Sequence, residues 1–566
     1  MFGELKTSYE FGPFRVDPRE RQLMRNGEVV PLRPKVFDIL LLLVQNSGHV
    51  LTKDDVMKQI WSNTAVEEGN ISRTISTLRT VLGEHPRDHR YIETVPWRGY
   101  RFVANVREVW VEEAVTRVES IAVLPFVSVK PDPKTEYLVD GITDSLIRSL
   151  AQSTNIRVTS RNSAFRYKGR EVDAQTVGHD LKVQALVLGR VAQSDLSLSI
   201  SIELIDARDD RHLWGAQYIR PPEDLLATCE TITRNIHEQL RLDLPDKNHL
   251  IAARHKPKHD AHVLFLKGRY HFNKLTPDGV QRAQEYLLQA TQLDPEYALA
   301  YAALSDCHNY LNQRIEAKAA VSKALALDEA LGEAHATLGF YRFLYEWDFA
   351  GAEDSFKRSL ALNPNYAEAH HWYAIYLANL GRHSEAEREA KRAVELDPLS
   401  LLMNMTAALN FYIAREHEQA IDQLHRVLEL ETNFLAARSV MGNVLVQKKM
   451  YEQAIGEFHK VLELVRGVPA VEVSVKAIIA QAYGRWGNRK EALKLLQEVE
   501  AAGTASWYSI AGIYAALSEV DSAFESLNKA YEQHDVSLVS LKVDPSLDGV
   551  RSDPRFNQLM AAVGIP

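Results

Sequence analysis

The sequence predicts a multidomain protein that combines an α+β amino-terminal domain, an α/β middle domain and an all-α carboxy-terminal superhelix. Three observations support this prediction. β-rich pieces and amphipathic helices mix over the first hundred residues, strands and helices alternate in the middle, and an alanine recurs about every 34 residues in the second half. The length of 566 residues accommodates several domains, and 46% hydrophobic with 25% charged residues is typical of folded protein.

The amino-terminal domain begins with two β-rich pieces, Tyr9–Val16 and Gln22–Leu32, which a turn separates. Pro34 then stands where a first helical turn favours proline. Thr52 and Asp55 have the spacing of a capping box and predict the start of a short second helix.

A third helix, predicted over residues 69–82, has one apolar face and an opposite face of hydrogen-bonding side chains without carboxylates. Such a face can contact base edges while it lies beside phosphates. We therefore expect it to be a recognition helix. The apolar positions are Ile71, Ile75, Leu78 and Leu82, and the opposite positions are Asn70, Arg73, Thr77 and Thr80.

Alternating apolar residues between Ile92 and Phe102 predict a hairpin whose tip is Trp97-Arg98-Gly99. An arginine at such a tip can enter the minor groove of DNA, where the potential is negative. Residues 1–105 contain 15 Lys+Arg and 13 Asp+Glu, a net charge of +2. Since the whole chain has a net charge of −9, the remaining residues have a net charge of −11. A more basic end on an acidic chain agrees with an anionic partner for that end.

Residues 8–105 resemble the OmpR-type winged helix-turn-helix family, including its CadC-like regulators. The segments that carry the resemblance are Arg33–Leu40, Val50–Thr52, Ile60-Trp61, Val66–Glu68, Leu78-Arg79 and Glu93–Phe102. The family implies binding to double-stranded DNA. By this resemblance the DNA-contacting residues are Asn70, Arg73, Thr74, Thr77 and Arg79 on the helix, Arg98 on the wing, and Trp61 through its indole N–H.

The middle domain, over residues 118–245, begins with an apolar strand at Ser120–Phe126 and continues with alternating helices and strands. It resembles the TolB-amino-terminal-like domain, which often lies between an output module and helical repeats in bacterial regulators. Asp140-Gly141 and Gly189-Arg190 suggest either a ligand cleft or, as the favoured alternative, turns and close packing. A linker over residues 246–260 contains histidines without metal-ligand spacing, so we expect a solvated segment.

The second half of the chain contains a repeat of about 34 residues, marked by alanines that begin similar amphipathic runs. It resembles the tetratricopeptide repeat, which implies about eight helix pairs over residues 261–535, a right-handed superhelix and a concave groove for a protein or peptide partner. Residues 536–566 are expected to form a terminal cap. The marker alanines are Ala283, Ala317, Ala352, Ala386, Ala420, Ala454, Ala492 and Ala523.

Catalysis is not expected. The sequence has no GxxxxGK phosphate loop, no HExxH and no GxSxG, and we assign no catalytic residue, cofactor or metal site. Two cysteines suit a reducing compartment, and no segment has the ~18 apolar residues of a membrane span. The charged stretch Val103–Ser120 also excludes a membrane tether there, and the first residues do not form a signal peptide, so we expect a cytoplasmic protein.

The resulting hypothesis is a bacterial transcriptional regulator whose winged helix binds promoter DNA while the other domains sense or recruit a protein or small molecule. The sequence begins about eight residues before the first expected strand. We therefore expect no receiver domain ahead of it and an input from the carboxy-terminal side. A homodimer on DNA is compatible with this arrangement. The alternatives are a tetratricopeptide interaction scaffold whose winged helix is a docking module and, with less support, an antibiotic-regulator-like protein that dimerises through its repeats.

Overall fold

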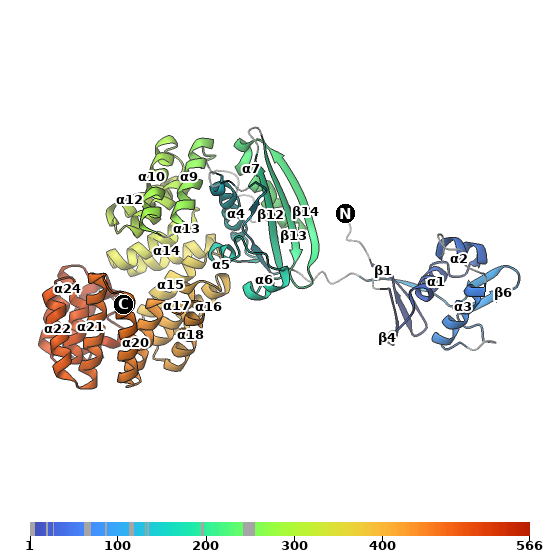
Figure 1. Cartoon of the computed structure of the whole chain (residues 1–566). Helices are drawn as coiled ribbons and strands as arrows, with labels where there is room; N and C mark the ends of the chain where they lie inside the picture. Colours follow the sequence, from blue (N-terminus) through green and yellow to red (C-terminus); the bar gives the residue numbers. More distant parts are fainter. Residues whose placement is uncertain are drawn as a thin grey trace. The chain divides into compact units, whose positions relative to one another are not determined.

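The computed structural model describes residues 6–18, 21–26, 28–60, 69–84, 88–111, 118–130, 132, 135–193, 197–240, 255–274 and 276–566. The chain divides into two compact units, Met1–Arg117 and Val118–Pro566 (Figure 1). The first unit is the α+β domain. The second contains the α/β domain together with the helical repeats, so the three predicted fold classes are all present.

The first unit has two antiparallel sheets and three described helices. One sheet has the order β4-β3-β2-β1-β8 and the other β5-β7-β6. The strands are β1 (Lys6–Phe11), β2 (Phe14–Asp17), β3 (Gln22–Arg25), β4 (Glu28–Val30), β5 (Val50–Thr52), β6 (Ile92–Val95), β7 (Gly99–Phe102) and β8 (Arg107–Val111), and the helices are α1 (Pro34–Gln45), α2 (Lys53–Ile60) and α3 (Gly69–Val81).

Each of the two β-rich pieces at the amino end is a hairpin, because a residue with positive φ reverses the chain inside it. Gly12 has φ 51° and separates β1 from β2, and Asn26 has φ 53° and lies between β3 and β4. The predicted helix starts are confirmed. Pro34 is the first residue of α1, and the Thr52 hydroxyl accepts from the Asp55 N–H at 3.1 Å while the Asp55 carboxylate accepts from the Thr52 N–H at 3.1 Å.

The α/β domain is a mixed sheet, in the order β11-β9-β12-β13-β14, with helices on both faces. The apolar residues of α4 and α7 share one core with one face of the sheet, whereas α6 packs on the other face. The elements are β9 (Ser120–Val123), β10 (Val127–Ser128), α4 (Glu136–Ala151), β11 (Arg157–Val158), α5 (Arg161–Phe165), α6 (Ala174–Leu181), β12 (Ala185–Gln193), β13 (Leu198–Asp206), β14 (Arg211–Arg220), the 3-10 turn η1 (Pro222–Asp224) and α7 (Leu225–Gln239).

Eight antiparallel helix pairs follow, as the repeat spacing predicts, and all eight marker alanines are at most 1% exposed. The pairs are α9 (His259–Phe272) with α10 (Pro277–Leu293), α11 (Ala298–Tyr310) with α12 (Arg314–Leu327), α13 (Gly332–Tyr341) with α14 (Phe349–Leu362), α15 (Ala367–Asn379) with α16 (His383–Leu396), α17 (Leu401–Ile413) with α18 (His417–Leu430), α19 (Leu435–Gln447) with α20 (Tyr451–Leu464), α21 (Pro469–Trp486) with α22 (Arg489–Ala502), and α23 (Trp507–Ala516) with α24 (Val520–Glu532).

The two insertions in the repeat period have separate structural explanations. The extra residue before Ala352 is accommodated by a π-helical turn, η2 (Arg342–Glu346), after which Trp347 takes a left-handed conformation with φ 53°. The longer spacing before Ala492 is accommodated by α21, which has 18 residues where α19 has 13. Neither insertion interrupts the alternation of first and second helices.

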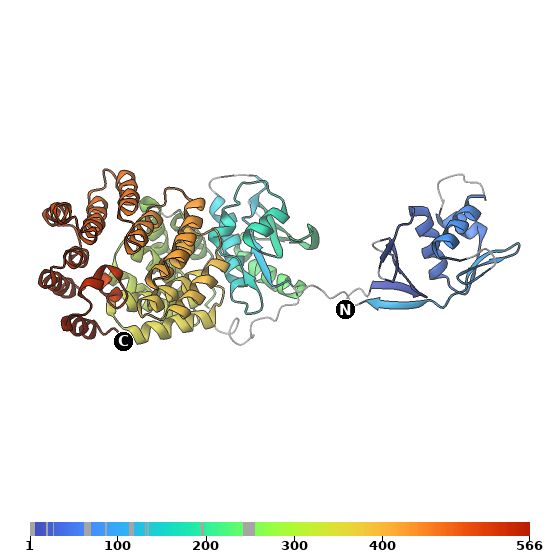
Figure 2. The same ribbon diagram turned by 90° about the horizontal axis from the view of Figure 1, so that it is seen from below.

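The residues that follow α24 fold back toward earlier repeats, which the curvature of the stack brings near, and they contact the turns after η2 and α17 (Figure 2). The His534 ring stacks on Trp347 with centroids 3.7 Å apart, and Arg415 pairs with Asp548 at 2.9 Å. Part of the repeat surface is therefore covered by the protein itself. The segment comprises η3 (Val536–Ser540), η4 (Pro545–Val550) and α25 (Pro554–Val563).

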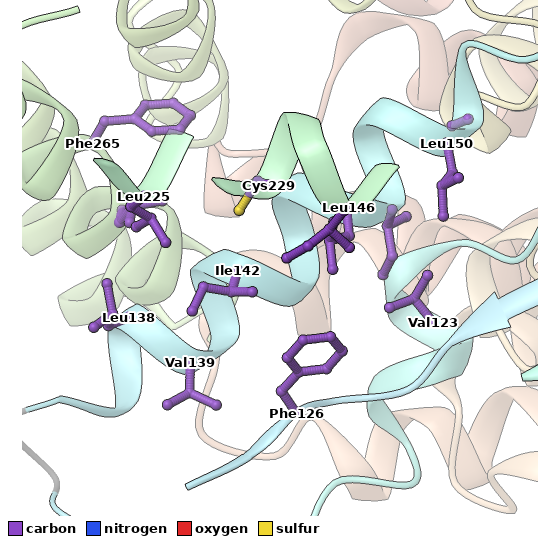
Figure 3. Close-up of a cluster of buried hydrophobic side chains, with 14 of the residues drawn as sticks. Val123, Phe126, Leu138, Val139, Ile142, Leu146, Leu150, Leu225, Cys229 and Phe265 are labelled. Carbon is purple, nitrogen blue, oxygen red and sulfur yellow. The ribbon is translucent and has the colours of Figure 1, made fainter. Parts of the chain in front are cut away.

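The α/β domain and the first repeats share a continuous apolar core, in which Phe265 of α9 lies near α4 and α7 (Figure 3). Polar contacts extend the junction. The Asn365 Nδ2 lies within 3.1 Å of the Ala151, Ser153 and Ile156 carbonyl oxygens, and Ser163 donates to Asp397 at 2.5 Å. These two parts are accordingly one compact unit. Of the predicted linker, residues 246–254 lie outside the described residues.

Candidate nucleic-acid interface

Helix α3 is held by its apolar side in the core of the first unit. Ile71, Ile75 and Leu78 are at most 1% exposed and pack with the apolar residues of α1. Because these positions face inward, the opposite side of the helix faces solvent, and its exposed residues are Asn70, Arg73, Thr77 and Thr80. The amphipathic pattern predicted this orientation correctly.

Threonine hydroxyls on α3 donate to carbonyl oxygens one turn earlier in the helix. Thr77 donates to the Arg73 carbonyl at 3.0 Å and Thr74 to the Asn70 carbonyl at 2.8 Å. The hydroxyl proton is then used within the helix, and the oxygen presents lone pairs outward beside the γ-methyl group. Thr77 is exposed, and Thr74 is half-buried.

Arg73 and Arg98 are the exposed cations among the predicted contact residues. Arg98 lies at the tip of the β6–β7 hairpin, where its N–H donates to the Val95 carbonyl at 3.1 Å. Within the described parts of the chain, neither guanidinium forms an ion pair with a carboxylate. Both charges are thus available to an anionic ligand.

Arg79 lies differently from the other predicted contacts, because its side chain joins α3 to the hairpin. It donates to the Ile92 carbonyl at 2.9 Å and to the Thr94 hydroxyl at 2.8 Å. Its Nε lies 3.8 Å from the carboxylate of Glu84. This geometry gives Arg79 a positioning role for the hairpin.

Glu84 completes this connection and was not predicted from the sequence. Its carboxylate is buried and accepts the N–H groups of Tyr91 at 2.9 Å and Ile92 at 3.2 Å. A single acid after the end of a helix gives no sequence signal for such a role, because its partners are backbone groups of a later strand.

The hairpin also packs against α3 and β5 through its second strand. The Ser72 and Tyr100 hydroxyls are 3.2 Å apart, and a Cβ on Gly99 would lie 2.0 Å from the Leu51 carbonyl oxygen. Gly99 is therefore required where β7 pairs with β5. Trp61, the remaining predicted contact, lies outside the described residues.

The preceding helix is anchored by its capping box. Hydrogen bonds from the Thr52 hydroxyl and N–H lower the pKa of the exposed Asp55 carboxyl, because they favour its charged form. The acid stays ionised at the start of α2, where the helix dipole favours negative charge. This fixes the entry of the helix that precedes α3.

The described part of the chain also bears on a metal site, a disulfide and a membrane span, each of which requires particular residues. Its His, Cys, Asp and Glu side chains form no group of three that could hold a metal ion. Cys229 and Cys307 are free and buried, and burial raises the pKa of each thiol to about 12. None of its helices combines the length and the apolar character that crossing a bilayer requires.

For Gly141 and Gly189 the sequence left two explanations open, a ligand cleft or close packing, and the structure shows what surrounds each. A Cβ on Gly141 would lie 2.8 Å from Leu266, so this glycine serves close packing with α9. A Cβ on Gly189 would lie 2.4 Å from the Phe126 ring, which is also close packing. Gly189 and Arg190 in addition line a surface cavity of about 930 Å³ in the α/β domain.

Comparison with known families assigns the class of the two terminal domains. Residues 27–102 match the family described as "Transcriptional regulatory protein, C terminal", and residues 355–388 match the tetratricopeptide repeat. The amino-terminal domain is an OmpR/PhoB-type winged helix, and the carboxy-terminal helices are tetratricopeptide repeats.

Individual relatives agree with this class. The chain is 24% identical over 400 residues to the transcriptional regulator HilA of Salmonella typhimurium, a match that covers 68% of this chain and 70% of HilA. It is 35% identical over 103 residues to the transcriptional activator CadC of Escherichia coli, covering 18% of this chain and 20% of CadC. A protein named putative adenylate cyclase 3 of Rhizobium meliloti is 33% identical over 187 residues, covering 33% of this chain and 32% of that protein.

Proposed function

We propose that this protein is a DNA-binding transcriptional regulator. The observation that carries the proposal is the outer face of α3, which presents Asn70, Arg73 and Thr77 to solvent while the opposite face is buried in the domain core. An amide, a guanidinium and hydroxyl acceptors are the groups that contact base edges in the major groove. Relatives named as transcriptional regulators support the same function.

Each proposed contact has its own chemistry. Arg73 can donate two parallel hydrogen bonds to guanine or bind a phosphate, and Asn70 can pair with adenine. The Thr77 oxygen can accept from an exocyclic amine, and its methyl group can contact that of thymine. Arg98 reaches the minor groove from the hairpin, whose position relative to α3 is fixed by Arg79.

Binding to selected DNA tests the proposal. Duplexes are selected from a random pool with the full chain, and affinity is measured by fluorescence anisotropy for the wild type, Arg73→Ala and Arg98→Ala. Each substitution is expected to weaken binding at least tenfold and to reduce the salt dependence by about one phosphate-equivalent. Arg25→Ala, an exposed arginine on β3, serves as the matched control and should bind as the wild type.

The α/β domain and repeats are proposed to carry the input. Their shared core supports a single sensing or recruiting unit, with a protein or peptide partner on the repeat surfaces that the protein's own segments leave open. The TolB-amino-terminal-like assignment of residues 118–245 remains a prediction. Nuclease protection of genomic DNA separates this function from the scaffold alternative, which predicts protein capture without protection.

We further propose that the protein acts in the cytoplasm, where bacterial chromosomal DNA lies, and that it dimerises on DNA with repeated half-sites. Absence of catalysis is also part of the proposal, despite the relative named as an adenylate cyclase. Incubating the full chain with ATP and divalent cations and measuring cyclic AMP tests this point, and accumulation above a protein-free control would contradict it.

A further inference from the structure

Trp97 combines two features that do not favour folding. It lies at the tip of the β6–β7 hairpin, and it is fully exposed. Its φ of 66° places a bulky side chain in the left-handed region, which favours glycine or asparagine. Among the tryptophans whose side chains the structure describes, the next most exposed is Trp486 at 41%. The position of Trp97 therefore indicates a contact outside the chain.

The strands of the hairpin are held firmly, so the backbone at Trp97 is presented at a fixed place relative to α3. The Tyr100 hydroxyl contacts Ser72 of α3, and Arg79 of α3 bonds to the first strand of the hairpin. On the far side, the strand at Gly99 passes so close to Leu51 that no Cβ would fit. Motion of the hairpin as a whole is accordingly restricted by α3 and β5.

The charges around Trp97 identify the kind of partner. Arg98 follows it directly and has no carboxylate within ion-pair distance among the described residues. Glu93, the acid on the same hairpin, is paired with Arg101 at 2.9 Å. An unpaired cation beside a flat apolar ring fits a narrow anionic groove with sugar walls better than an apolar protein surface.

We propose that Trp97 packs into the minor groove of duplex DNA beside Arg98, as an uncharged anchor of the hairpin. This rests on the proposed DNA-binding function. The indole lies against deoxyribose walls or at a base step, as apolar side chains do in proteins that contact this groove. Arg98 supplies the attraction to the negative potential, and the ring supplies contact area that does not depend on salt.

The experiment compares the full-length wild type with Trp97→Gly, Trp97→Phe, Arg98→Ala and Arg73→Ala on duplexes selected by the wild type. Affinity is measured at several salt concentrations. Trp97→Gly is expected to bind about 5- to 100-fold more weakly than the wild type. This factor should be the same at every salt concentration, because the contact that is lost is uncharged. Trp97→Phe should retain most of the affinity, whereas Arg98→Ala should lower the salt slope by about one.

Stability separates a binding role from a folding role. Glycine suits a φ of 66°, so Trp97→Gly should melt at the same temperature as the wild type or slightly higher while it binds DNA less well. Val29→Ala removes an exposed apolar side chain elsewhere in the unit and should change neither property.

The outcomes distinguish the inference from the function on which it rests. If Trp97→Gly binds like the wild type while Arg73→Ala is weakened, the tryptophan proposal is overturned and the regulator proposal stands. A changed salt slope for Trp97→Gly, or Trp97→Phe as weak as Trp97→Gly, would also overturn the packing contact. If the wild type selects no duplex at all, the proposed function itself fails.

Discussion

Asn365 provides a direct test of how the α/β domain is joined to the repeats. It lies in the turn before α15 and is 4% exposed. Its amide nitrogen is 3.1, 2.9 and 3.0 Å from the carbonyl oxygens of Ala151, Ser153 and Ile156. Its oxygen accepts from Arg392 at 3.1 Å. The two N–H groups of one side chain are therefore shared among three carbonyl oxygens after α4.

The magnitude follows from the groups that Asn365→Ala leaves without partners. Each hydrogen bond contributes about 1 kcal/mol net, and a buried carbonyl left unpaired costs about 1–3 kcal/mol. With three carbonyl oxygens affected, and water partly replacing the amide, we expect a loss of about 3–5 kcal/mol in the stability of the junction. Asn365→Asp should be no better, because a carboxylate cannot donate to a carbonyl.

The assay is urea unfolding of the full chain, combined with hydrogen exchange of the backbone from Ser153 to Ser160. Asn433→Ala is the matched control. It lies in the corresponding turn before α19, but its side chain is exposed, so its effect should stay below about 0.5 kcal/mol. If Asn365→Ala showed the same unfolding midpoint and exchange as Asn433→Ala, the reasoning from these contacts would be refuted.

Three further predictions use other features of the fold. Glu84→Ala should destabilise the first unit by about 3 kcal/mol and weaken DNA binding, because buried N–H groups of the hairpin lose their acceptor. Thermal unfolding tests this, and a melting temperature equal to that of the wild type would refute it. Burial lowers the pKa of His371 to about 4. As the pH drops from 7 to 5 the unfolded state takes up a proton on this histidine and the folded state does not, so the free energy of unfolding should fall by about 2 kcal/mol. In urea unfolding measured at both pH values, His371→Asn should lack this part of the pH dependence. Gly442→Ala should destabilise by about 2 kcal/mol, because its Cβ would lie 2.3 Å from the Phe458 ring. By contrast, Gly456→Ala should stabilise α20 by about 1 kcal/mol, because nothing lies within 4 Å; equal melting temperatures for the two variants would count against this packing argument.

The recognition helix shows how far sequence reasoning reaches within the candidate site. Its period places Ile71 and Ile75 inward and Arg73 outward, and the structure has this arrangement. Arg79 has the same residue type and lies on the same helix, yet its guanidinium bonds to the hairpin. A helical period gives direction around the axis, but it does not show which later strand lies beside a long side chain.

The sequence by itself determined most local elements, their order and the number of repeats, because periodicity, capping residues and helix-breaking residues act within one turn or one strand. The marker alanines, for example, indicate eight helix pairs without any tertiary information. The sequence did not predict β8, whose pairing with β1 is a contact between distant segments. Only the tertiary structure decided what lies against what. The contacts of Asn365 with residues more than 200 positions earlier, and of His534 with Trp347, depend on how curvature accumulates along the stack. Such contacts join groups whose separation in sequence carries no periodic signal, so they are fixed by the packing of the whole unit.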